Sequence, residues 1–299
     1  MEQYKQLDFF NITIEGRKIT DSPTGGSDPI NLAAGENGIS NTAAIVTDLK
    51  PAAVTWNLWH GCTKVSAGCM NCYVYRRDLM HGSDPAMVRK TQSFDLPVRR
   101  YRSGSRKGEF KYSSGTLFYT CFSSDFFHPD ADEWRDEAWQ MMRTRSDCSF
   151  MMITKRPERV LRNLPSDWGN GYENVELGCT CENQAMADLR LPIFLELPLK
   201  HCSIMHEPLL GPIDIRKYLD KYTDKIDSVS VGGESGPQAR ICDYAWVLNI
   251  REQCREYNIP FHYHQTGANL LKDGRLFHIP RKEQHRQAAK AGIDFLKIQ

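Results

Sequence analysis

Three cysteines in one short run, Cys62, Cys69 and Cys72, are the residues of this sequence whose type and spacing point most directly to chemistry. They follow the apolar and aromatic stretch Ala53–Trp59. Thiolates are ligands of zinc and of iron–sulfur clusters, and three protein ligands leave one coordination position open. An open position admits a small molecule, so the run predicts a reactive metal centre.

Two kinds of metal centre are compatible with this run. A structural zinc site usually takes four ligands in two close pairs, and the run holds one such pair, Cys69 with Cys72. Zinc would need a fourth ligand, for which His60 or the pair Cys179 and Cys181 are candidates. A four-iron cluster on three thiolates keeps one iron free for a chelating molecule, and the position of the run after a strand favours the cluster.

The composition is that of an ordinary globular protein, with 40% hydrophobic and 25% charged residues and a net charge of +1. No stretch approaches the roughly 18 apolar residues of a membrane helix, and the first residues lack the apolar core of a secretory signal. We therefore expect a cytoplasmic protein without membrane contact, in which the remaining cysteines are buried thiols rather than disulfides. Those cysteines are Cys121, Cys148, Cys179, Cys181, Cys202, Cys242 and Cys254.

Short apolar runs alternate with helix-like stretches along most of the chain, which predicts a parallel sheet with crossover helices. So many consecutive units favour a full or partial (β/α) TIM-like barrel over an open doubly wound sheet, and no glycine fingerprint for a dinucleotide follows the first strand. The expected strands are Ala53–Trp59, Thr116–Phe122, Ser149–Ile153, Val175–Cys179, Cys202–Met205, Ser228–Val231 and Ile259–Tyr263. The expected helices are Tyr73–His81, Asp132–Arg143, Pro157–Leu164, Asn183–Glu196, Ile213–Tyr222 and Tyr244–Tyr257.

The expected organisation has three parts. Residues 1–50 read as an irregular extension with one short strand near Phe9–Ile14, residues 51–270 as the barrel, and residues 271–299 as a C-terminal extension. A basic insertion at about residues 87–112 interrupts the alternation, and its segment Arg99–Lys111 interleaves cations with aromatic rings. Such a texture can bind nucleic acid by stacking rings on bases, and a solvated surface excursion is the alternative.

Polar residues follow every expected strand. In a parallel barrel the carboxyl ends of the strands lie at one mouth, so these side chains should gather around one site. A capping role is the alternative for the serines and Asp125, a helix start for Lys155 and Arg156, and a tight turn for the two glycines. The strand-end candidates are Ser123, Ser124, Asp125, Lys155, Arg156, Glu182, Glu207, Gly232, Gly233, Glu234, His264 and Gln265.

A three-cysteine run after the first strand of an α/β barrel resembles the radical S-adenosylmethionine superfamily. More narrowly, the chain resembles an uncharacterised, phage-associated branch of it with a three-cysteine motif. The gap between Cys62 and Cys69 is longer than in the superfamily's commonest motif. The last strand ends in His264-Gln-Thr-Gly267, where the branch tends to have Lys-Gln-Trp-Gly. The matching segments are Thr55–Asn57, Gly61–Ser66, Gly68–Tyr73, Ser124–His128, Thr154–Arg159, Glu207–Ile213 and Val231–Gly236.

The resemblance implies a mechanism and a set of roles. The three cysteines would hold a [4Fe-4S] cluster whose open iron chelates S-adenosyl-L-methionine, and an electron from a flavodoxin or ferredoxin would cleave that cofactor to a 5′-deoxyadenosyl radical that abstracts hydrogen from substrate. Residues expected to contact S-adenosylmethionine are Ser123, Ser124, Asp125, Lys155, Gly232, Gly233 and Glu234. Residues expected on the substrate side are Arg156, Glu182, Glu207, His264 and Gln265.

Two other functions remain open at this point. One is a zinc-stabilised nucleic-acid-binding module that uses Arg99–Lys111, and the other is a catalytically silent barrel that serves as a partner protein. For the radical enzyme, nucleic acid or a nucleotide is a candidate substrate because of the basic insertion and the phage-associated relatives. That assignment rests on analogy.

Overall fold

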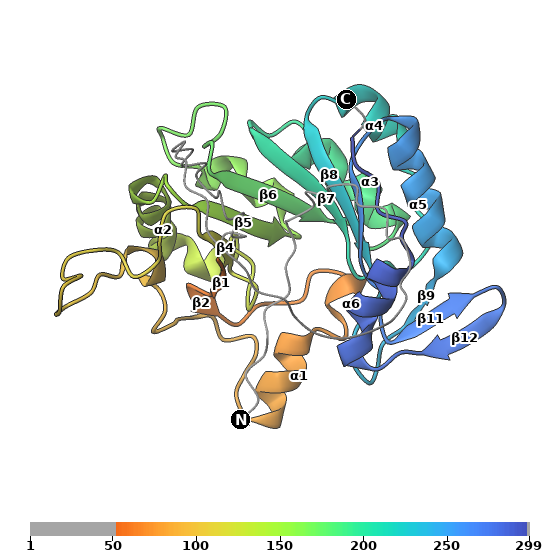
Figure 1. Cartoon of the computed structure of the whole chain (residues 1–299), viewed down its shortest axis with the longest axis horizontal. Helices are drawn as coiled ribbons and strands as arrows, with labels where there is room; N and C mark the ends of the chain where they lie inside the picture. The colour runs from red at the N-terminus through yellow and green to blue at the C-terminus, as the bar shows by residue number, and fades with distance from the viewer. Residues whose placement is uncertain (1–51, 298–299) are drawn as a thin grey trace, which may run out of the picture. The chain divides into compact units, whose positions relative to one another are not determined.

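The computed structural model describes residues 52–297, so the expected extension over residues 1–50 and its strand near Phe9–Ile14 lie outside the described residues. Its centre is a seven-stranded parallel sheet with the order β1-β4-β5-β6-β7-β8-β10, which curls into a half-barrel (Figure 1). The expected α/β class is confirmed, and all seven expected strands are present. They are β1 (Ala53–Trp56), β4 (Leu117–Thr120), β5 (Ser149–Thr154), β6 (Val175–Thr180), β7 (His201–His206), β8 (Ile226–Gly232) and β10 (Phe261–Gln265).

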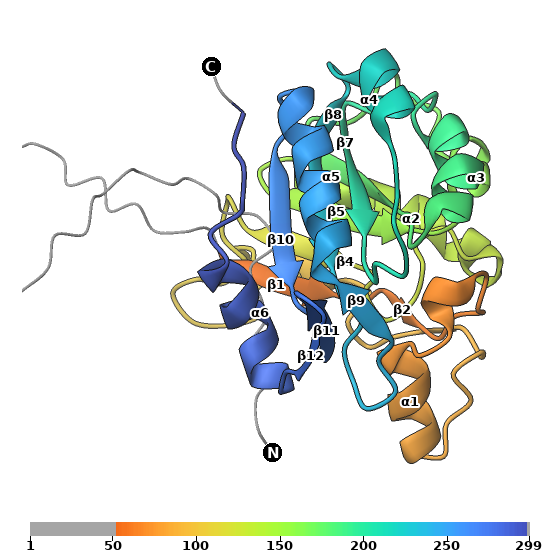
Figure 2. The ribbon, with the colours of Figure 1, turned by 90° about the vertical axis from the view of Figure 1, so that its right-hand side faces the viewer.

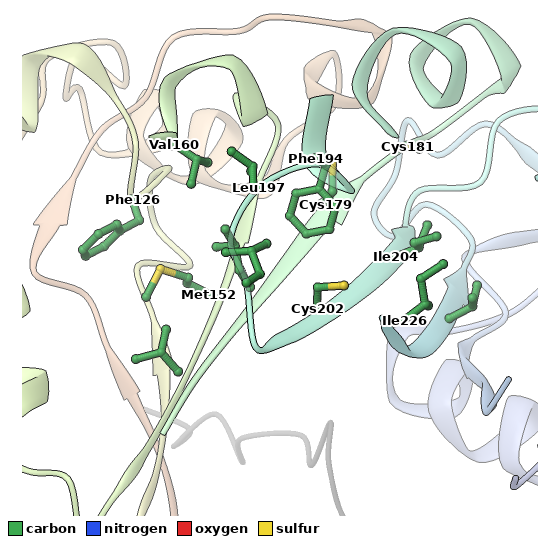
Figure 3. Close-up of a cluster of buried hydrophobic side chains, with 14 of the residues drawn as sticks. Phe126, Met152, Val160, Cys179, Cys181, Phe194, Leu197, Cys202, Ile204 and Ile226 are labelled. Carbon is green, nitrogen blue, oxygen red and sulfur yellow. The ribbon is translucent and has the colours of Figure 1, made fainter. Parts of the chain in front are cut away.

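Helices cover one face of this sheet (Figure 2). Alternate strand residues such as Met152, Cys179 and Ile204 point to that side and pack with Phe194 and other apolar side chains (Figure 3). All ten cysteines are free and the seven scattered ones are buried, as expected. The covering helices are α2 (Asp132–Thr144), α3 (Gln184–Phe194), α4 (Arg216–Tyr222) and α5 (Tyr244–Glu256).

The opposite face of the central strands is more polar. Successive residues of a strand point to opposite faces, so Glu176 of β6, Ser203 of β7 and Ser230 of β8 lie on the face away from the helices. Glu176 Oε1 and both serine hydroxyls are shielded from solvent. Burial, together with the nearby Asp227 carboxylate, raises the pKa of Glu176 to about 7.

The expected helix over Pro157–Leu164 is wrong. Two short 3-10 turns, η4 (Pro157–Arg159) and η5 (Leu161–Asn163), take its place. Leu164 is extended because Pro165 follows it, and a residue before proline avoids the helical region. The segment is too short to form a stable helix before that stop. The other short turns are η1 (Ala67–Cys69), η2 (Leu96–Val98) and η3 (Pro129–Ala131).

Residues 271–297 pack onto the same compact unit as the sheet. Helix α6 (Arg281–Lys290) lies against β10, and Phe295 exchanges two backbone hydrogen bonds with Phe261, at 2.8 and 2.9 Å. A small second sheet, in the order β12-β11-β9, precedes α6. Its strands are β9 (Ile241–Asp243), β11 (Asn269–Lys272) and β12 (Arg275–His278).

The basic insertion begins with β3 (Arg89–Lys90), which pairs antiparallel with β2 (Trp59–His60), and continues as a surface excursion. Within the excursion, the Arg100 guanidinium lies 3.8 Å from the Phe110 ring centre and that of Arg106 lies 4.5 Å from the Tyr101 ring centre. A guanidinium of the same chain thus already covers one face of each ring. A base that stacked on that face would have to displace the guanidinium. Within residues 52–297, no helix has the length and apolar character that crossing a membrane demands.

Candidate functional site

The three cysteines lie on one loop, residues 61–73, which we call the cysteine loop. Cys62 follows β2, Cys69 ends the turn η1, and Cys72 is the N-cap of α1 (Tyr73–Met80). All three are half-buried, unlike the seven other cysteines. Residues at the carboxyl ends of the sheet strands hold this loop in place. Three of these contacts involve a buried carboxylate.

The first anchor is Asp125, which follows β4 and is buried. Its Oδ1 accepts hydrogen bonds from the Thr154 hydroxyl and the Phe127 N–H, both at 2.9 Å. Its Oδ2 accepts from the Lys155 N–H at 3.0 Å and from Arg156 Nη1 at 3.1 Å. Both carboxylate oxygens are therefore fully engaged, and the Arg156 guanidinium is fixed in direction.

Arg156 connects Asp125 to the cysteine loop. Its Nη2 donates to the Thr63 carbonyl at 2.8 Å and to the Thr63 hydroxyl at 3.0 Å. Its Nη1 lies 3.7 Å from Cys62 Sγ. Burial raises the pKa of the Cys62 thiol to about 11 although the Arg156 charge opposes the rise. A fixed cation beside the thiol favours the thiolate that a metal would require.

The second anchor is Glu182, which follows β6 and is fully buried. Its Oε1 accepts a hydrogen bond from the Gly68 N–H at 2.8 Å, and its Oε2 accepts from Arg190 Nη1 at 2.8 Å. Gly68 precedes Cys69, and a Cβ there would lie 2.9 Å from Glu182 Cδ. Burial alone would raise the pKa of Glu182, but its donors hold that pKa below its usual range. The close approach of loop and carboxylate therefore needs a glycine at this position.

The third anchor is Glu234, which follows β8. Arg240 binds its carboxylate with Nε at 2.9 Å and Nη2 at 2.5 Å, and the Arg240 N–H adds a third bond at 2.9 Å. Asn71, the residue before Cys72, donates from Nδ2 to Glu234 Oε2 at 3.0 Å. Burial opposes ionisation of Glu234, but Arg240 and Asn71 outweigh it and lower the pKa.

The two serines after β4 also hold the loop. The Ser124 hydroxyl donates to the Gly61 carbonyl, and the Gly61 N–H donates to the Ser123 carbonyl at 3.3 Å. The Ser123 hydroxyl donates to the Trp59 carbonyl at 3.1 Å. The Lys155 ammonium differs, because it has no hydrogen bond or ion pair among residues 52–297. Of the strand-end groups expected to contact S-adenosylmethionine, the Lys155 ammonium is the charged one left without a partner there.

A second polar cluster lies at the ends of β7 and β10. Glu207 Oε2 lies 2.8 Å from His264 Nδ1, and Gln265 Nε2 donates to Glu207 Oε1. Burial opposes the charge of Glu207, but His264 and Gln265 more than offset it and lower the pKa of this carboxyl. Glu207, His264 and Gln265 were all expected on the substrate side, and the structure brings them into contact.

The two glycines at the end of β8 allow a side chain and a backbone segment of the same protein to approach closely. A Cβ on Gly232 would lie 2.7 Å from Glu207 Cδ, and one on Gly233 would lie 2.3 Å from the Thr266 carbonyl oxygen. The neighbouring His206 is fully buried, its Nδ1 lies 2.6 Å from the Cys181 carbonyl oxygen, and burial lowers its pKa to about 4.

The cysteine loop fits a three-thiolate site in donor type. Within the described part of the chain, however, no three Cys, His, Asp or Glu side chains converge as they would around a metal ion, so binding one would require the thiols to reorient. The two suggested sources of a fourth zinc ligand, His60 and the pair Cys179 and Cys181, are engaged elsewhere in the structure. His60 Nε2 is held by Asp78 at 2.6 Å, and Cys179 and Cys181 belong to the apolar core (Figure 3).

Sequence reasoning missed the partners that turn these residues into anchors, namely Thr63, Asn71, Arg190 and Arg240. Asn71 lies inside the cysteine run, but its residue type does not indicate a contact with a distant carboxylate. Arg190 follows Glu182 by eight residues, yet nothing in the sequence says that helix α3 turns its side chain back to the strand end. Only the three-dimensional structure supplies that information.

Comparison with known proteins adds a family but no activity. A family profile with the description "Protein of unknown function (DUF5131)" matches residues 47–294. No curated protein and no solved structure matches the chain. The matched range includes the whole half-barrel, the cysteine loop and its three anchors.

Proposed function

The chain belongs to the DUF5131 family, and from the residues that its half-barrel gathers we propose that it is a radical S-adenosylmethionine enzyme. One observation carries the proposal. Three half-buried cysteines lie on a loop that strand-end carboxylates anchor at three places on one edge of a parallel half-barrel. Barrel enzymes carry their reactive groups at the carboxyl ends of the strands. Thiols with a purely structural role would not need to lie there.

In this proposal Cys62, Cys69 and Cys72 hold a [4Fe-4S] cluster, as the resemblance of their run implies. Cluster and S-adenosylmethionine together would supply a one-electron cleavage of the sulfonium bond, which yields a radical able to take hydrogen from a substrate. Asp125, through Arg156, keeps a cation beside Cys62. A positive group at that position favours the thiolate and offsets the negative charge that ligation collects.

The remaining strand-end residues divide into anchors and ligand contacts. Glu182 and Glu234 are engaged by arginines and by the cysteine loop, so we assign them to positioning the loop rather than to contacting substrate or ribose. The Lys155 ammonium is the cation we assign to the cofactor carboxylate. Glu207 and His264 form a pair that could orient a substrate or hold a proton at the imidazole.

The proposal is tested by loading the full chain with iron and sulfide under anaerobic conditions. We expect about four irons per chain, and with S-adenosylmethionine and dithionite we expect 5′-deoxyadenosine by mass spectrometry. The variant C62A/C69A/C72A should lose both iron and product. A matched control, Cys254→Ala, removes a buried thiol from helix α5 and should retain both. Stoichiometric zinc with no iron uptake, or iron that survives the triple substitution, would refute the proposal.

A further inference from the structure

An open cavity of about 590 Å³ lies beside the cysteine loop, and Ser123 is the one residue expected to contact S-adenosylmethionine that lines it. Its lining combines the segment after β1, helix α1 and the β3 strand of the basic insertion, and none of the three cysteines belongs to it. Its volume lies in the range of sites for small molecules, roughly 300–1,000 Å³.

The charges around this cavity are mainly positive. Arg77, Arg89 and Lys90 line it, and Asp78 is the one acidic lining residue. Asp78 is buried, and its Oδ2 lies 2.6 Å from His60 Nε2, so this carboxylate already has a partner. Lys90 is also engaged, since its ammonium lies 3.0 Å from Glu137.

The two arginines differ from Lys90. Arg77 and Arg89 are exposed, and neither makes an ion pair or a side-chain hydrogen bond with any part of the chain that the structure describes. Two guanidinium groups at one cavity without a carboxylate partner are a strong attraction for an anion. Guanidinium donors match phosphate oxygens in pairs, which makes phosphate the favoured anion.

Half-buried polar groups complete the cavity. Thr55, Asn57 and Ser93 contribute hydroxyl and amide groups to the lining. The Asn57 Oδ1 accepts from the Ser123 N–H at 3.0 Å, which fixes the direction of its amide. Such neutral donors and acceptors suit sugar hydroxyls or a base edge.

From this arrangement we propose that the cavity binds a phosphate-bearing small molecule of nucleotide size, with its phosphate at Arg77 and Arg89. The basic insertion then contributes to a small-molecule site through Arg89. The inference does not depend on the proposed radical chemistry, because no cysteine lines the cavity and binding needs neither cluster nor S-adenosylmethionine.

The test is calorimetric titration of the full chain, without iron, with ADP, pyrophosphate and uncharged adenosine. We expect ADP and pyrophosphate to bind and adenosine to bind far more weakly. The variant R77A/R89A should weaken ADP binding at least about tenfold per arginine, as the loss of a charge-assisted pair predicts. R77K/R89K keeps the charge and should restore part of the affinity, because lysine lacks the paired donors.

A charge-matched control separates this site from general attraction. Arg102 and Lys107 are exposed in the excursion and do not line the cavity, so R102A/K107A should leave ADP affinity unchanged. Melting curves show whether each variant is folded. Absence of ADP binding, equal binding by R77A/R89A, or equal loss in R102A/K107A would overturn the inference. Binding of a single-stranded oligonucleotide without any binding of ADP would also overturn it, since the ligand would then be a polymer.

Discussion

Arg156 links a buried carboxylate to the first cysteine of the loop. Both partners of the Arg156–Asp125 pair are almost completely buried, with 5% and 6% of their side chains exposed. A buried pair contributes little net stability compared with apolar residues, but removing one partner leaves the other charge unpaired at high cost. The pair is therefore better understood as a device for placing the guanidinium than as a source of stability.

Asp125→Asn should destabilise the fold strongly. An amide cannot accept the four hydrogen bonds that Asp125 accepts and leaves Arg156 without its counter-charge, so we expect a loss of about 3–5 kcal/mol in the free energy of unfolding by urea. Asp220→Asn is the matched control, because Asp220 is exposed on α4, and it should change that free energy by less than about 0.5 kcal/mol. Equal effects of the two substitutions would contradict the anchoring role of Asp125.

Glu176 should make stability depend on pH. Its pKa is about 7 in the folded protein and 4.5 in the unfolded reference, so the carboxyl is protonated in both states below about pH 4.5. Between pH 4.5 and 7 the unfolded chain ionises first, and the folded state loses stability relative to it. Glu176→Gln removes this loss, so its melting temperature should exceed that of the parent chain at pH 8 by more than at pH 4.5.

The control for this pH dependence is Glu158→Gln, at an exposed position in η4. Its difference from the parent chain should stay constant across the same pH range. A constant difference for Glu176→Gln as well would show that Glu176 ionises normally in the folded protein.

At the scale of elements, the cysteine loop has little regular structure of its own and depends on its anchors. Its one 3-10 turn has no buried residue, and neither that turn nor helix α1 has a side-chain cap at its N-terminus. The contacts of Thr63, Gly68 and Asn71 with three strand ends replace that missing local order. The position of the thiols is thus determined by the sheet.

Gly68→Ala should loosen this element without changing the thiols. The new Cβ would meet Glu182 Cδ, and that side chain cannot retreat because it is buried and bound to Arg190. We expect a cost of about 1–3 kcal/mol and severalfold faster alkylation of Cys69 by iodoacetamide. Gly211→Ala is the control, since nothing lies within 4 Å of its Cβ position, and it should leave the alkylation rate unchanged. An unchanged rate in Gly68→Ala would show that the Gly68 contact does not order the loop.

How much the sequence could predict differs between elements. The seven strands were predictable because each is a compact apolar run, and the polar strand ends follow from parallel topology. The anchors were not predictable, because Glu234 and Asn71 are 163 residues apart in the chain. The β11–β12 hairpin could have been found: its turn is Asp273-Gly274, both with positive φ, which is the sequence signal of a tight hairpin.

At the scale of the whole described unit, part of residues 271–297 packs against the outer edge of β10. Asp294 Oδ1 accepts from the Tyr263 N–H at 2.8 Å, and Asp294 Oδ2 lies 2.9 Å from His262 Nδ1. Phe295 forms an antiparallel bridge with Phe261, the first residue of β10. These contacts satisfy the outer edge of β10, which the seven-stranded sheet leaves open.

A chain that ends at residue 270 should therefore lose cooperative unfolding, because β10 would lose both α6 and its paired segment. Asp294→Ala tests the same edge in the intact chain and should cost about 1–3 kcal/mol, since it leaves a buried N–H without an acceptor. Thermal unfolding followed by circular dichroism measures both. A shortened chain that melts as sharply as the full one would show that residues 271–297 are dispensable.

The spacing of the three anchors has a mechanical consequence. They are attached to β4 and β5, to β6 and to β8, so any change in the curvature of the sheet alters the distances between the points that hold the loop. Linkage is reciprocal, so a group that binds the loop in its native arrangement must also oppose flattening of the sheet. A ligand bound at the loop should therefore stiffen the half-barrel, and a stiffer half-barrel should bind that ligand more tightly.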